Sequence, residues 1–153
     1  MSLDGRIELD KVKDKKAKMS VFEWLNEAGE KLLLPKTTLK NLKGVVFEVR
    51  QGYKSKDSKR QNADISNASN AYANLYLPTL FLLSTQIDEG VASRYTKAQW
   101  LLLNGTTNGS AVESSYVFCR NVIGYDLAEF FERNSEKIRK EIVQILTSLL
   151  KAD

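Results

Sequence analysis

A continuous apolar run, Thr79–Ser84, most constrains how this chain folds. A strand without alternating polar residues is typical of a parallel sheet, because helices cover both of its faces. A second strand is predicted at 45–49, where β-branched and aromatic residues follow a glycine. Between these two runs, residues 58–75 have a helical pattern rich in small residues, which favours close packing on a sheet. Strand, helix and strand in this order predict a parallel βαβ unit.

The rest of the chain also alternates between the two kinds of element. A helix is predicted to begin at Ser20, which forms a capping box with Glu23, and to end before Pro35. The other predicted elements are a helix at 89–103, a strand at 112–119 and a helical region from Asp126 with a break at 134–135. We therefore expect an α/β fold, with a central mixed sheet flanked by helices.

The length of 153 residues suits one domain with its own core. Residues 20–153 are expected to form this domain, and the lysine-rich residues 1–19 are expected to be a basic N-terminal arm or a cloning remnant. No window reaches the roughly 18–20 unbroken apolar residues that a membrane span needs, so no membrane partner is expected. The single cysteine, Cys119, cannot form an internal disulfide, which favours a cytoplasmic location.

The absence of histidine excludes several kinds of chemistry. Catalysis by a histidine base and zinc sites built on histidine are both ruled out, and one cysteine is too few for a thiolate zinc site. Any metal must have oxygen ligands, which points to Mg²⁺ or Mn²⁺. The net charge of +4 permits an anionic partner without requiring one.

Glu48 and Arg50 are the first residues with chemical potential. They are two positions apart on the predicted strand, so both side chains project from the same face near its end. A carboxylate beside a cation can hold a divalent metal and stabilise charge on a phosphate. The same pair can equally be an ion pair in solvent at the end of a strand, and the motif alone leaves both interpretations open.

A cluster of cations follows this strand. Its members are Arg50, Lys54, Lys56, Lys59 and Arg60, opposed only by Asp57. Cations bind phosphates and amides such as Asn62 reach base edges, so contact with double-stranded DNA is expected, with a solvated loop as the alternative. The predicted helix 58–75 begins beside this cluster, where its free N–H groups favour anions. Arg94 and Lys97 near the start of the predicted helix 89–103 would extend the phosphate-binding face, or would equally form a solvated face.

These segments together resemble the catalytic core of the PD-(D/E)xK nucleases, especially the type II restriction endonucleases. The resemblance lies in the strand Gly44–Arg50, the basic turn after it, the Asn/Ala-rich helix and the buried strand 79–84. It implies a restriction-endonuclease-like three-layer sandwich, complete or truncated, that cleaves DNA by metal-dependent phosphodiester hydrolysis.

The resemblance also implies roles for single residues. Glu48 would bind Mg²⁺ or Mn²⁺, with Glu30 or Asp57 as a further ligand. Arg50 would replace the lysine of the family and, with Lys54, would stabilise charge on the phosphate. The side chains that would contact the duplex are Lys56, Lys59, Arg60, Asn62, Arg94 and Lys97. The family also has an Asp ahead of this strand, whereas no acidic residue lies between Leu32 and Phe47 here.

Two alternatives to a nuclease remain open: a DNA-binding module without catalysis on the same scaffold, and a protein-interaction module. The C-terminal helix bears on the second of these. It has one apolar stripe, made of Ile138, Ile142, Ile145, Leu146 and Leu149. This stripe would pack internally or form a dimer seam. Because restriction enzymes are often dimers, the resemblance favours a homodimer through this helix.

Overall fold

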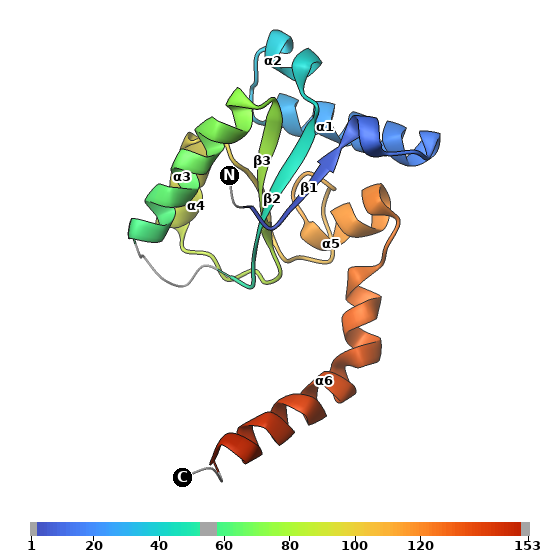
Figure 1. The fold of residues 1–153 in the computed structure, drawn as a ribbon, viewed down its shortest axis with the longest axis vertical. Coiled ribbons are helices and arrows are strands. Elements are labelled where there is room, and N and C mark those ends of the chain that lie inside the picture. The colour runs from blue at the N-terminus through green and yellow to red at the C-terminus, as the bar shows by residue number, and fades with distance from the viewer. Residues whose placement is uncertain (1–2, 53–57, 151–153) are drawn as a thin grey trace.

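The computed structural model describes residues 3–52 and 58–150, without the side chains of residues 58–65. Its centre is a mixed four-stranded sheet in the order β1-β2-β3-β4 (Figure 1). The strands are β1 (Gly5–Glu8), β2 (Gly44–Arg50), β3 (Tyr76–Leu82) and β4 (Leu101–Leu103). β1 runs antiparallel to β2, whereas β2, β3 and β4 are parallel. This confirms the expected α/β class with a mixed sheet.

Helices cover both faces of this sheet. The six α-helices of the described residues are α1 (Lys15–Lys31), α2 (Lys36–Asn41), α3 (Ser58–Ala73), α4 (Glu89–Lys97), α5 (Ser115–Phe118) and α6 (Leu127–Leu150). A short 3-10 helix, η1 (Leu9–Lys11), follows β1, and a π-helical turn, η2 (Cys119–Ile123), follows α5. No helix in the described ranges is both long and apolar enough to cross a bilayer.

The larger core lies between the sheet and α1 with α5. Trp24 of α1 and Phe118 of α5 contact each other, with ring centroids 4.6 Å apart, and Phe47 of β2 lies 5.6 Å from Phe118. All three side chains are buried. Since side chains alternate along a strand, the neighbours of Phe47 on β2 must project from the opposite face.

The second core fills that opposite face, under α3 and α4. Leu80 and Leu82 of β3 pack there with Tyr95 and Trp100, whose rings are 5.7 Å apart in an edge-on arrangement. α3 contributes the small buried residue Ala68, which lets this helix approach the sheet closely, as its composition predicted.

The N-terminal segment differs from the expected arm. Residues 5–8 form β1 and bond to β2, and α1 begins at Lys15 rather than after Ser20. Asp14 caps this helix by accepting a hydrogen bond from Ala17 N–H at 2.7 Å, so the predicted capping box at Ser20 is wrong. Aspartate is as favourable an N-cap residue as serine. Because the cap is at Asp14 and not at Ser20, the helix is longer by more than one turn.

Three predictions for the second half of the chain are also wrong. The helix predicted at 89–103 ends at Lys97, and Leu101–Leu103 form β4 instead. Residues 115–118, predicted within a strand, form α5. α6 runs without a break through Asn134, whose side-chain amide donates to Phe130 O and so keeps its polar group satisfied within the helix.

Replacing Leu33 with glycine is expected to stabilise the protein by about 0.5–1 kcal/mol, because only glycine adopts its conformation without strain. Leu33 follows α1 with a φ of 54°, and its side chain is 88% exposed, so little packing is lost. Urea denaturation measures the effect. Leu32→Gly is the matched control: Leu32 has a φ of −84°, so this change should destabilise, and a destabilised Leu33→Gly would contradict the argument.

Candidate functional site

The carboxyl ends of the parallel strands meet at one edge of the sheet, where open α/β sheets usually bind ligands. Arg50 at the end of β2 pairs with Leu82 of β3, and Leu83 N–H donates to Arg50 O at 2.9 Å. Gly105, just after β4, donates its N–H to Ser84 O at 3.2 Å. These bonds hold three strand ends together, and this edge also receives the beginning of α3 (Figure 1).

Glu48 and Arg50 lie at this edge and form an ion pair through Glu48 Oε1 and Arg50 Nη2. The prediction that both side chains share one face of β2 is therefore confirmed. Glu48 pairs in register with Leu80, so the face is the one under α3 and α4. Glu48 is only 6% exposed, which makes it the one buried acid of the described residues. A carboxylate this well shielded interacts more strongly with cations than one in water.

Asp4 is a third polar residue near this place, and it is not among the site residues predicted from the sequence. Its N–H donates to Phe47 O at 3.0 Å, and its Oδ2 accepts a hydrogen bond from Val49 N–H at 2.8 Å. Glu48 is the residue between these two partners. The residue just before β1 thus places a second carboxylate against the β2 backbone next to Glu48, 44 positions earlier in the chain.

A signal for this strand was present in the sequence. Apolar Ile7 and Leu9 alternate with charged Arg6 and Glu8, which is the pattern of a strand with one buried face. In the structure Ile7 and Leu9 pack against the larger core. The many lysines of residues 1–19 favour the interpretation of this segment as a basic arm, although the alternation predicts a strand.

Asp4 and Glu48 would provide only part of the oxygen ligands that a hard divalent cation needs. Mg²⁺ is usually held by one or two carboxylates, together with waters and substrate phosphates. Asp4 and Glu48 are two carboxylates from neighbouring strand positions, the first accepting from Val49 N–H and the second contacting Arg50. No group of three or more acidic, cysteine or histidine side chains that could hold a metal ion gathers at this edge or anywhere else in the described part of the chain.

Two other metal ligands were expected from the sequence. Glu30 lies on α1, whose buried residues pack on the face opposite to Glu48, so the sheet separates the two carboxylates. We therefore remove Glu30 from the metal set, as a correction. Asp57 lies outside the described residues, as do the cations Lys54 and Lys56.

The remaining DNA-binding candidates are on α3 and α4. Lys59, Arg60 and Asn62 belong to the beginning of α3, the helix that follows β2 in the chain; their side chains are not among those described. Arg94 and Lys97 are exposed on α4. Lys97 ends that helix just before β4 begins, so it lies toward the amino edge, away from Glu48. The expectation that Lys97 extends the same phosphate-binding face is thus corrected.

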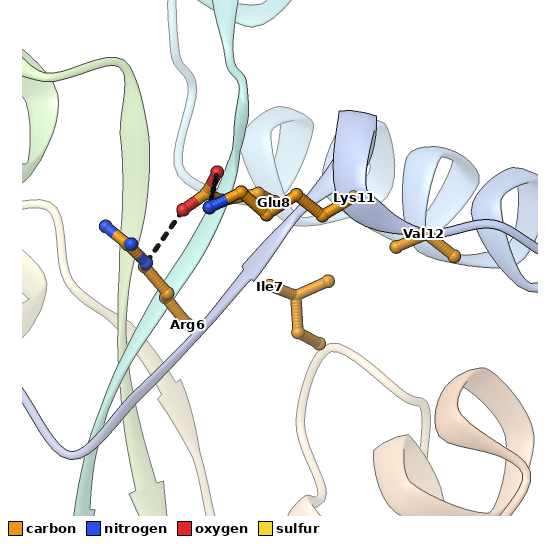
Figure 2. A pocket seen from close by; sticks show the side chains of 5 residues that line it. All are labelled: Arg6, Ile7, Glu8, Lys11 and Val12. Carbon is orange, nitrogen blue, oxygen red and sulfur yellow. Dashed lines mark ion pairs between the residues drawn. The ribbon is translucent and has the colours of Figure 1, made fainter.

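A shallow pocket of about 250 Å³ lies along β1 and η1 (Figure 2). Glu8 is its centre: it pairs with Arg6 at 2.8 Å and with Lys11 at 3.0 Å. The hydrogen bond from Lys11 is the main cause that lowers the pKa of Glu8 below its usual value. Because one carboxylate neutralises part of both cations, this pocket holds β1 against η1 rather than presenting a cation pair to a ligand.

No family model matches this chain, and no curated protein or solved structure is significantly similar to it.

Proposed function

We propose that this protein is a DNA endonuclease domain of restriction-enzyme type, which hydrolyses phosphodiester bonds with Mg²⁺ or Mn²⁺. One observation carries the proposal: Asp4 bonds to the residues on both sides of Glu48, and Glu48 contacts Arg50. The PD-(D/E)xK resemblance implies an Asp ahead of the strand with the acid-x-cation pair, and Asp4 lies ahead of β2, just before its antiparallel neighbour β1. Asp4 would supply the acid that is missing between Leu32 and Phe47.

Each residue has a distinct part in this proposal. Glu48 and Asp4 would hold the metal ion, which polarises the phosphoryl oxygen and lowers the pKa of a bound water. A carboxylate has about four lone-pair sites, so Glu48 can accept from Arg50 and still bind a cation. Arg50 would stabilise negative charge on the phosphate; its very high pKa excludes a role as general base. Lys54 is a second candidate for the same stabilising charge.

Recognition of the duplex is assigned to the basic segment after β2. Lys56, Lys59, Arg60 and Asn62 would contact the DNA backbone, since α3 begins at the carboxyl edge where Glu48 lies. Arg94 lies on the neighbouring helix and would add a contact. The proposal includes a restriction-endonuclease-like three-layer arrangement, a cytoplasmic location and a homodimer.

A non-catalytic DNA-binding module is the second candidate, and two observations favour it. Glu48 is engaged in a buried ion pair, and the described residues contain no group of three or more acidic, cysteine or histidine side chains that could hold a metal ion. With so few ligands the affinity for Mg²⁺ would be low, and the basic segment could bind DNA without cleaving it.

The test is cleavage of supercoiled plasmid by the full chain. Nicked or linear product is expected with Mg²⁺ or Mn²⁺, and none after EDTA removes the metal. DNA affinity is measured in parallel over a salt series, because each phosphate contact adds about 0.9 to the slope of log K against log salt. Steep salt-dependent binding without any cleavage would support the second candidate, and no DNA binding at low salt would reject both.

A further inference from the structure

The apolar stripe of α6 has no partner within the described residues. No residue of this helix is buried, and α6 extends away from the sheet and its covering helices (Figure 1). Six apolar side chains are more than half exposed: Ile142, Val143, Ile145, Leu146, Leu149 and Leu150. Single exposed apolar residues are common on protein surfaces, but a contiguous group of this size marks an interaction surface.

We propose that α6 pairs with α6 of a second copy of this chain. This inference specifies the homodimer of the proposed function, but it rests on α6 itself and not on nuclease activity. Ile138, Ile142, Ile145 and Leu149 follow spacings of four, three and four residues, which is the a/d pattern of a two-helix seam. Leu146 flanks this seam and widens it.

Charge favours a second copy over a partner of opposite charge. Residues 143–150 contain no charged side chain, so this surface offers nothing for an acidic or basic partner to complement. Two ion pairs lie within the helix nearer its start: Arg133 with Glu129 at 3.5 Å, and Lys137 with Glu141 at 4.0 Å. A seam of this kind is self-complementary, as a twofold interface requires.

The area available is sufficient for a weak dimer. Burying an aliphatic side chain removes about 60–120 Å² from water, so the five stripe side chains of each helix would bury about 600–1,200 Å² in total. A specific interface needs about 1,000 Å². The dissociation constant is therefore expected in the micromolar range. α6 projects from the α/β body, so a second helix can reach its outer half (Figure 1).

The test is sedimentation equilibrium of the full chain over a range of concentrations. The wild type is expected to change from the 17.3 kDa monomer to a dimer with rising concentration. Ile145→Glu places a charge in the seam of both copies and should weaken the dimer by about 100-fold or more. Gln144→Glu adds the same charge at the next position, outside the stripe, and should leave the dimer unchanged.

Three results would overturn the proposal: a wild type that stays monomeric at about 100 μM, an Ile145→Glu variant that still dimerises like the wild type, or equal weakening by both substitutions. Circular dichroism controls for folding. Because α6 contributes no buried residue, both variants should keep their helix content and the α/β body should stay folded. Plasmid cleavage is scored separately, so loss of the dimer and loss of activity are distinguishable.

Discussion

Replacing Glu48 with glutamine is expected to lower Mg²⁺-dependent plasmid cleavage by about 10³-fold or more. A metal ion contributes several kcal/mol of transition-state stabilisation, and each 1.36 kcal/mol is a factor of ten in rate. The glutamine amide keeps the shape of the side chain and its oxygen can still accept from Arg50. The lost charge should cost about 1–2 kcal/mol of stability, so the thermal unfolding of the variant must be measured beside its activity.

Asp4→Asn is the companion variant for this prediction. If Asp4 and Glu48 hold one ion, the double variant should be hardly slower than Glu48→Gln alone, because residues that act as a unit are not additive. Glu89→Gln and Asp10→Asn are matched controls, since both carboxylates are exposed and lie on other elements. Full activity of Glu48→Gln, or loss of activity in the controls to the same extent, would remove the site from consideration.

Gly105→Ala is expected to have a large effect on stability. A Cβ atom at Gly105 would overlap the backbone of Leu83 and Ser84, where the ends of β3 and β4 approach each other. Backbone atoms of a sheet cannot move aside as a flexible side chain can, so the strand ends would have to separate. We expect destabilisation of about 3 kcal/mol.

Chemical denaturation measures this loss, and Gly5→Ala is its control. Gly5 lies in β1 with no atom near the position of an added Cβ, so its substitution should change the free energy of unfolding little. An equal effect at both positions would show that glycine content matters and not the close approach at Gly105. Because Gly105 borders the carboxyl edge, its alanine variant should also reduce any DNA cleavage.

The predicted strand–helix–strand unit is confirmed because each of its parts is specified locally. β-branched residues favour β2, small residues suit α3, and the continuous apolar run requires burial on both faces as β3. Glu48 and Arg50 share a face for an equally local reason, the twofold period of a strand. These features depend on neighbours a few positions apart, which a single sequence displays.

The wrong predictions depend on contacts between distant segments. α5 forms where a strand was predicted because Ser114 caps it and Ser115 Oγ donates to Leu103 O at 3.0 Å, across to β4. α4 ends where Gln99 takes a left-handed conformation, with a φ of 58°, and no glycine or proline marks that position. For α5, the hydrogen bond to β4 outweighs the local preference of these residues for a strand.

Residue order along this chain was enough to establish the βαβ unit, the shared face of Glu48 and Arg50, and the exclusion of histidine chemistry. The position of Asp4 beside Glu48 came only from folding, since the hydrogen bond to Val49 joins residues 45 positions apart. The exposure of the α6 stripe came from folding too. Pairing between distant strands, and the packing or projection of an amphipathic helix, depend on which surfaces meet, and a local pattern does not specify that.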